Sequence, residues 1–92
     1  MENEIFERYV IFVEQLRFGR GFDRIEMDTI LSKIRESVLL LGYVTKKNCL
    51  ILINMPHDLE AGFGLANSLE REELEKAVAD FMSFADDLLN EE

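Results

Sequence analysis

The sequence predicts a single α+β domain, in the order α-α-β-β-α, with a small β-hairpin packed against helices. A chain of 92 residues forms one domain, and a hydrophobic content of 48% is enough for a packed core. Three segments place apolar residues at spacings of three and four, the pattern of an amphipathic helix. Residues 49–53 are instead a short uninterrupted apolar run, which is typical of a buried strand.

The first helix is predicted over residues 3–18. Because residues 9–13 are all β-branched or aromatic, a strand through this stretch is the alternative. Gly19 and Gly21 are predicted to end the helix, since glycine readily adopts the left-handed conformation that closes one. The apolar face of this helix consists of Ile5, Phe6, Tyr9, Phe12, Val13 and Leu16.

The second helix is predicted over residues 23–41, with Gly42 as the residue that closes it. The alternative is a pair of strands, residues 38–44 and 49–55, around a four-residue turn. The helix is favoured because one face repeats with helical periodicity. That face consists of Ile25, Ile30, Leu31, Ile34, Val38 and Leu41.

The hairpin is predicted from residues 49–53 and 61–66, with a turn at Pro56 and His57. In the second strand the larger side chains alternate with glycine and alanine, which suggests a bulge or a close backbone neighbour. A two-stranded sheet is marginal on its own and needs helical cover or pairing across a dimer axis. A homodimer is therefore a hypothesis at this point.

A final helix is predicted to begin after Asn67, which would cap it together with Glu70 in a capping-box pattern. A strong apolar stripe follows and runs through most of the remaining chain. The stripe consists of Leu74, Ala77, Val78, Phe81, Phe84, Ala85 and Leu88.

The negative charge is concentrated in this last segment. Residues 67–92 contain nine acidic residues against Arg71 and Lys76, a net charge of −7, and residues 1–66 add −2 to give the total of −9. Such a chain is not expected to bind nucleic acid directly, because phosphate recognition needs clustered Lys and Arg. Anionic membranes are disfavoured for the same reason. The expected partner is a basic protein.

The composition predicts a soluble, cytoplasmic protein. Cys49 is the only cysteine, so no disulfide can form within the chain. The acidic start of the sequence is unlike a signal peptide, and the apolar runs are too short to span a bilayer.

No catalytic, metal-binding or cofactor-binding motif is found, so we expect neither an enzyme nor a cofactor. Cys49 and His57 would suggest a nucleophilic pair, but Cys49 opens the predicted strand and is expected to be buried and inert. His57 is interpreted as a solvated turn residue. The glycines at positions 62 and 64 lack the neighbours that a phosphate-binding loop requires and are interpreted as structural.

Three arginines around two glycines form the one local basic patch. It is interpreted as a solvated loop rather than an anion site. These residues are Arg17, Arg20 and Arg24.

Acids near the end of the last helix are harder to explain than those at its start, because a helix C-terminus disfavours negative charge. Several acids are expected to project opposite the apolar stripe, and two apolar residues lie off its centre. The predicted partner-binding residues are Glu73, Asp80, Met82, Asp86, Asp87 and Leu89. One interpretation is that these acids are only solvated surface that aids solubility. The other is that they belong to a non-enzymatic inhibitor, immunity or antitoxin-type protein that masks a basic site on its partner, such as a nucleic-acid-binding site. A protein that mimics nucleic acid is a variant of this hypothesis.

A second hypothesis comes from the segment 61–89, where a strand leads into a final amphipathic helix. In this general character it is similar to type III secretion chaperones, which are small acidic α+β dimers. The similarity covers a third of the chain and includes no diagnostic motif. It implies a chaperone or assembly adaptor that acts as a homodimer and holds an unfolded segment against its strands.

Overall fold

The computed structural model describes residues 2–18, 21–65 and 67–90, with all of their side chains except those of residues 2, 65, 68 and 89. No strand occurs among these residues, so the predicted α+β class is wrong and the domain is all-α. Its elements are α1 (Glu2–Arg17), α2 (Arg24–Leu41), α3 (Lys46–Ala61), the 3-10 helix η1 (Gly62–Leu65) and α4 (Ser68–Leu89).

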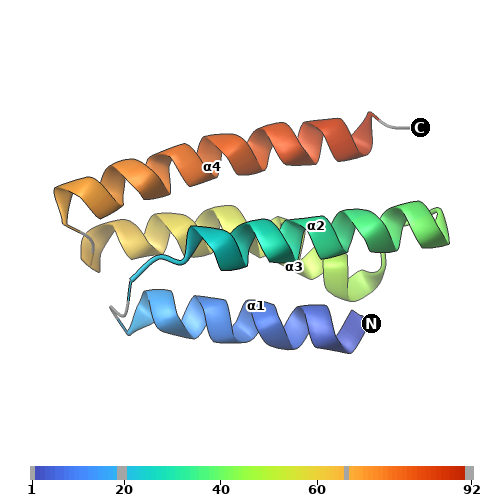
Figure 1. Cartoon of the computed structure of the whole chain (residues 1–92), viewed down its shortest axis with the longest axis horizontal. Helices are drawn as coiled ribbons and strands as arrows, with labels where there is room; N and C mark the ends of the chain where they lie inside the picture. Colours follow the sequence, from blue (N-terminus) through green and yellow to red (C-terminus); the bar gives the residue numbers. More distant parts are fainter. Residues whose placement is uncertain (1, 19–20, 66, 91–92) are drawn as a thin grey trace.

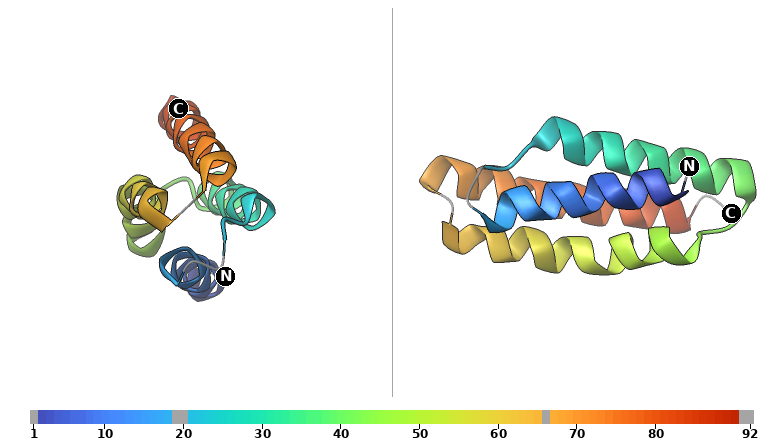
Figure 2. Two further views of the ribbon diagram at one scale, coloured as in Figure 1. Left: turned by 90° about the vertical axis from the view of Figure 1, so that its left-hand side faces the viewer. Right: turned by 90° about the horizontal axis from the view of Figure 1, so that it is seen from below.

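The four α-helices lie lengthwise in an elongated bundle (Figure 1) with principal extents of 39, 24 and 19 Å. Seen end-on, they occupy four corners, with α1 and α4 on opposite corners and each in contact with both α2 and α3 (Figure 2). α1 and α3 run in one direction, and α2 and α4 run in the other. Because α2 and α3 occupy the other two opposite corners, the connection between them crosses a diagonal of the bundle.

α1 confirms the predicted first helix, and the alternative strand through residues 9–13 is wrong. Helical spacing places its large apolar residues on one buried face, which a strand would have split between two faces. Five residues of the predicted face are at most 8% exposed: Ile5, Tyr9, Phe12, Val13 and Leu16.

α2 confirms the second predicted helix and its closure at Gly42. The Asp23 side chain caps the start by accepting a hydrogen bond from the Glu26 N–H at 3.0 Å. At the other end, Gly42 has φ of 81° and donates its N–H to the Val38 carbonyl at 2.8 Å. Two residues of the predicted apolar face, Ile25 and Leu41, are instead 80% and 44% exposed.

α3 replaces the predicted hairpin. Residues 49–53 lie inside this helix, and Pro56, predicted to be in a turn, also lies within it. A short apolar run does not distinguish a buried strand from a helix, and its flanking residues decide here. Thr45 caps the helix by accepting a hydrogen bond from the Asn48 N–H. The fully buried residues of α3 then recur at helical spacing: Asn48, Ile51, Met55 and Leu59.

The predicted second strand is also absent. Ala61 ends α3, residues 62–65 form η1, and Ala66 lies outside the described residues. Gly62 lies between two helices, and a Cβ atom at this position would make ordinary van der Waals contact, at 3.5 Å, with Leu16 of α1 and Leu74 of α4. The homodimer hypothesis based on pairing two hairpins thus loses its premise.

α4 confirms the last predicted helix and its cap, since the Asn67 side chain accepts a hydrogen bond from the Glu70 N–H at 2.9 Å. Its predicted stripe packs into the core through Leu74, Ala77, Phe81 and Leu88. Among the described residues, no helix combines the length and apolarity needed to cross a bilayer.

Candidate functional site

All of the predicted partner-binding residues lie on α4, which forms one edge of the bundle (Figure 1). Glu73, Asp86 and Asp87 are exposed, and Met82 is 58% exposed. Leu89 is the last residue of the helix, and its side chain lies outside the described part of the structure. The core side chains of α4 hold this surface on a regular helix rather than on a loop.

Asp80 differs from the other predicted acids because it is already engaged within the chain. Its Oδ2 atom lies 2.7 Å from Nη2 of Arg24 on α2. The same guanidinium donates from Nε to Asp28 Oδ1 at 2.9 Å. The hydrogen bond to Asp80 is the main cause that raises the pKa of Arg24, and partial burial opposes it. Asp80 therefore links α4 to α2 and is less available to a partner.

The acids of α4 form two rows rather than one face. Glu73, Asp80 and Asp87 recur every seven residues, so they lie along one side of the helix. Because Asp80 contacts Arg24, this row follows the edge of α4 that faces α2. Asp86 lies about 100° around the helix from Asp87 and so outside this row. It is therefore on the same side as Met82, one turn earlier.

Most of the exposed acids on α4 form no ion pair with a described residue. Glu75 forms an ion pair with Arg71 at 3.5 Å within the helix. Both side chains are more than half exposed, so this pair contributes little to stability. The exposed acids of α4 without an ion-pair partner among the described residues are Glu72, Glu73, Asp86 and Asp87.

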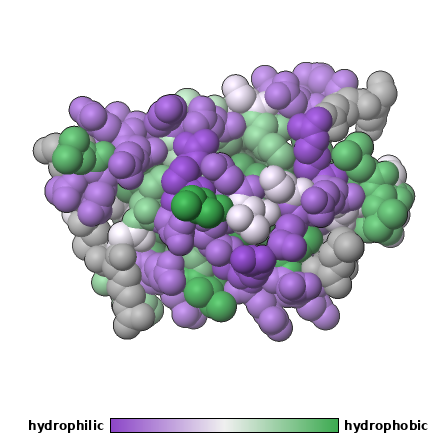
Figure 3. Space-filling model, in the orientation of Figure 1, coloured by the Kyte–Doolittle hydropathy of each residue, from purple (hydrophilic) through white to green (hydrophobic). Residues whose placement is uncertain are grey.

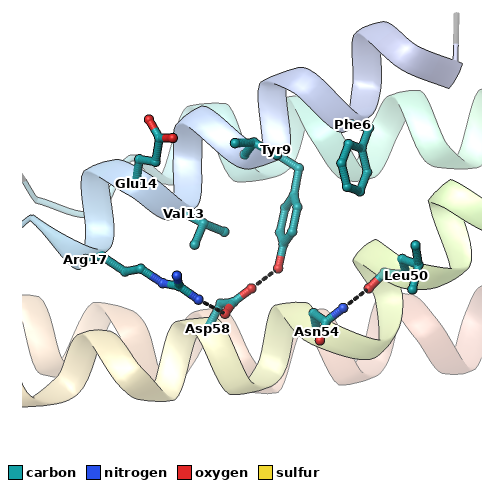
Figure 4. A pocket seen from close by; sticks show the side chains of 9 residues that line it. Phe6, Tyr9, Val13, Glu14, Arg17, Leu50, Asn54 and Asp58 are labelled. Carbon is teal, nitrogen blue, oxygen red and sulfur yellow. Dashed lines mark hydrogen bonds and ion pairs between the residues drawn. The ribbon is translucent and has the colours of Figure 1, made fainter.

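A groove between α1 and α3 was not predicted from the sequence (Figure 4). Its volume is about 350 Å³, at the small end of the range for ligand pockets. Its apolar lining comes from Phe6, Val10, Val13 and Leu50, and its polar lining from Tyr9, Glu14, Arg17, Asn54 and Asp58.

Three of the polar residues of this groove form a set of interactions between α1 and α3. The Tyr9 hydroxyl donates a hydrogen bond to Asp58 Oδ2, and Arg17 Nη2 lies 3.6 Å from Asp58 Oδ1 (Figure 4). Burial, followed by the hydrogen bond to the Asp58 carboxylate, raises the pKa of Tyr9. Tyr9 therefore stays protonated, and both oxygens of Asp58 are engaged. The arrangement joins two helices and engages both Tyr9 and Asp58.

No signal in the sequence could have revealed this set, because it depends on the register between two helices 41 to 49 residues apart. The sequence also grouped Arg17, Arg20 and Arg24 into one basic patch. In the structure, Arg17 contacts Asp58 on α3, while Arg24 contacts Asp28 and Asp80. Arg20 lies outside the described residues.

The predicted burial of Cys49 is wrong, since its side chain is exposed on α3. His57 is exposed on the same helix. The two are eight residues apart, which separates them by about 12 Å along the helix axis and prevents their action as a catalytic pair.

No group of three or more potential metal ligands comes together within the described residues. The site that the residues support best is therefore the set of exposed acids on α4, with Met82 on the side of the helix where Asp86 lies. Comparisons of the chain with protein-family models, with curated proteins and with solved structures found no match.

Proposed function

We propose that this protein is a non-enzymatic protein-binding module, of inhibitor, immunity or antitoxin type, which uses α4 to cover a basic site on a partner protein. The observation that carries the proposal is the set of exposed acids on α4, of which Glu73, Asp86 and Asp87 have no ion-pair partner among the described residues, with the exposed Met82 beside Asp86. Asp86 and Asp87 lie in its last turns, where the helix dipole makes acids unfavourable by a few tenths of a kcal/mol each. A binding role accounts for their position.

The chemistry of this surface defines the partner. Several exposed carboxylates on one helix attract a patch of Lys and Arg and accelerate association, while Met82 supplies an adaptable apolar contact. Nucleic-acid-binding sites are rich in Lys and Arg, so a protein with such a site is the natural target. Binding by α4 would then block access of the nucleic acid.

A charge-matched pair of variants tests this proposal. The variant Glu73→Gln/Asp86→Asn/Asp87→Asn removes three exposed carboxylates from α4, and Glu4→Gln/Glu7→Gln/Glu36→Gln removes three exposed ones from α1 and α2. Each is used as bait in lysate of the native host at about 50 and 500 mM salt. The α4 variant should lose captured partner at low salt by about tenfold or more, and the control should keep it.

The captured protein is then purified and tested with nucleic acid. The proposal requires that the wild-type protein displace nucleic acid from it and that the α4 variant fail to do so. Equal loss of capture in both variants, or capture that is insensitive to salt, would show that α4 is not the binding surface.

A second candidate function, a chaperone or assembly adaptor, is favoured by one observation. Leu39, Leu40, Leu41 and Tyr43 at the end of α2 are 44–73% exposed. Hydrophobic residues gather at the edge of the molecule where α2 ends (Figure 3). An adaptor of this kind would hold an apolar segment on this cluster, and not on strands.

The two candidates are separated by the variant Leu39→Gln/Leu40→Gln. An adaptor should lose its captured client in this variant and keep it in the α4 variant. The inhibitor proposal expects the reverse result.

A further inference from the structure

The outer face of α3 carries a regular series of exposed side chains that the bundle does not use. They recur at spacings of four, three, four and three residues, and at 100° per residue all of them fall within an arc of about 80°. The series consists of Lys46, Leu50, Ile53, His57 and Glu60. It is distinct from the buried series of α3, which ends at Leu59.

This spacing is that of a coiled-coil seam. Residues that alternate at three and four positions average 3.5 per turn and remain on one line when two helices pack side by side. The centre of the series is apolar and solvent-exposed, with Leu50 at 48% and Ile53 at 60% exposed. Val10 of α1, 39% exposed, lines the groove beside Leu50 and widens the apolar centre.

We propose that α3 packs antiparallel against α3 of a second copy of this chain, about a two-fold axis at Ile53. The inference is independent of the function proposed for α4. It also differs from the dimer suggested by the sequence, which required strands.

The distribution of charge identifies a second copy as the occupant. Lys46 precedes Ile53 by seven residues and Glu60 follows it by seven. In an antiparallel pair centred on Ile53, Lys46 therefore meets Glu60 of the partner subunit, and the same contact is made twice. Ile53 packs on its own symmetry mate, and Leu50 packs near His57 of the partner subunit. A parallel pair would instead bring together like charges at both ends.

The small size of the contact surface determines the expected affinity of the dimer. A helix of 16 residues is about 24 Å long, and one helix pair with a flanking side chain buries less than a standard interface. We therefore expect a reversible dimer with a Kd in the micromolar range, roughly 1–100 µM.

Oligomeric state is the first test. Light scattering of the full chain between about 5 and 500 µM should show a shift from monomer to dimer. Ile53→Asp should weaken association about 100-fold or more, because it buries two carboxylates on the axis. Ile25→Asp changes an isoleucine that is 80% exposed on α2 and should leave association unchanged. Circular dichroism of both variants checks that the helices are retained.

Charge reversal tests the register. Lys46→Glu and Glu60→Lys should each weaken the dimer, by about tenfold at low salt, because each replaces two attractive pairs with two repulsive ones. The double variant restores opposite charges across the axis and should recover most of the affinity. Additive losses would contradict the antiparallel register.

Cysteine cross-linking tests the position of the axis. In a Cys49→Ser background, Ile53→Cys should form an intermolecular disulfide under mild oxidation. The native Cys49 lies four residues from the axis, so its two copies are about 12 Å apart along the helices and should not cross-link. A monomer over the whole concentration range, or a dimer that is insensitive to Ile53→Asp, would overturn the proposal. Loss of a different binding partner in Ile53→Asp, with the protein monomeric throughout, would overturn it as well.

Discussion

At the scale of single residues, the side chains that join the helices are those the sequence could not pair. Tyr9 and Arg17 reach Asp58 from α1, and Arg24 reaches Asp80 from α2. Each of these contacts depends on how one helix is positioned against another. Of the interactions within three or four residues, the cap from Asn67 to Glu70 was predicted correctly, but the cap from Thr45 to Asn48 was not.

Tyr9→Phe tests the contact between α1 and α3 through its dependence on pH. Burial and the Asp58 carboxylate raise the pKa of Tyr9 above its ordinary value of 10.0. As the pH rises, the Tyr9 hydroxyl therefore loses its proton in the unfolded chain before it does so in the folded protein. The stability that the protonated hydroxyl contributes is complete below pH 10 and declines above pH 10. Above pH 10, the free energy of unfolding of the wild type, measured with denaturant, should fall with each pH unit by up to about 1.4 kcal/mol more than that of Tyr9→Phe. Identical slopes for the two proteins would contradict the raised pKa.

Asn48 provides a second test at this scale. Its side chain is fully buried, and neither its Nδ2 nor its Oδ1 has a hydrogen-bond partner among the described residues. Such a group costs about 1–3 kcal/mol of desolvation. Asn48→Leu should therefore raise the free energy of unfolding by about 1 kcal/mol in urea titrations. A loss of stability would mean that a buried water satisfies the amide.

At the scale of elements, the helical periodicity of apolar residues predicted three helices, and an uninterrupted apolar run misled the prediction of the fourth. Residues 49–53 have the composition of a strand, yet Thr45 caps a helix that includes them. The helix also contains Pro56, whose missing N–H normally disfavours an interior position by about 3 kcal/mol. Burial of Ile51, Met55 and Leu59 at helical spacing outweighs this cost.

The glycines that end α2 and α3 give opposite predictions. Gly62 has an ordinary φ of −70°, and a methyl group there would make van der Waals contact with Leu16 and Leu74. Gly62→Ala should therefore stabilise the protein by about 0.5 kcal/mol, chiefly by restricting the unfolded chain. Gly42 has φ of 81°, so Gly42→Ala should destabilise it by about 1 kcal/mol. Chemical unfolding of both variants measures the difference, and a loss of stability in Gly62→Ala would show that the junction of α3 and η1 is overpacked.

At the scale of the whole molecule, the net charge of −9 works against compactness, and α4 contributes most of it. The stabilising contacts lie between α1, α2 and α3 and along the buried side of α4. The exposed side of α4 is therefore left with charges that the fold does not need. This separation of a packed side from a charged side is the basis of the proposed function.

The variant Asp86→Lys/Asp87→Lys tests whether the exposed charges of α4 are unnecessary for the fold. Each replacement changes the charge by two, so the net charge moves from −9 to −5, and the new cations suit the C-terminal end of the helix. At low salt the variant should be more stable by about 0.5–1 kcal/mol, and the gain should shrink at about 1 M salt. Glu4→Lys/Glu7→Lys makes the same change in charge near the start of α1, where acids are favourable, and should not stabilise the protein. A gain of the same size in both variants would attribute the effect to net charge alone.

The sequence by itself determined the start of α2, the start of α4, the closure at Gly42, the apolar faces of α1 and α4 and the excess of acid in the last helix. These features are local, because caps, helical periodicity and charge depend on neighbours within a few turns. Only the tertiary structure decided that residues 49–53 are helical and that Cys49 is exposed. It also decided that Asp80 forms an ion pair, whereas Glu73, Asp86 and Asp87 form none with the described residues. An apolar run is compatible with either a strand or a helix, and the packing of the rest of the core decides between them. Whether an acid forms an ion pair depends on which helix packs beside it.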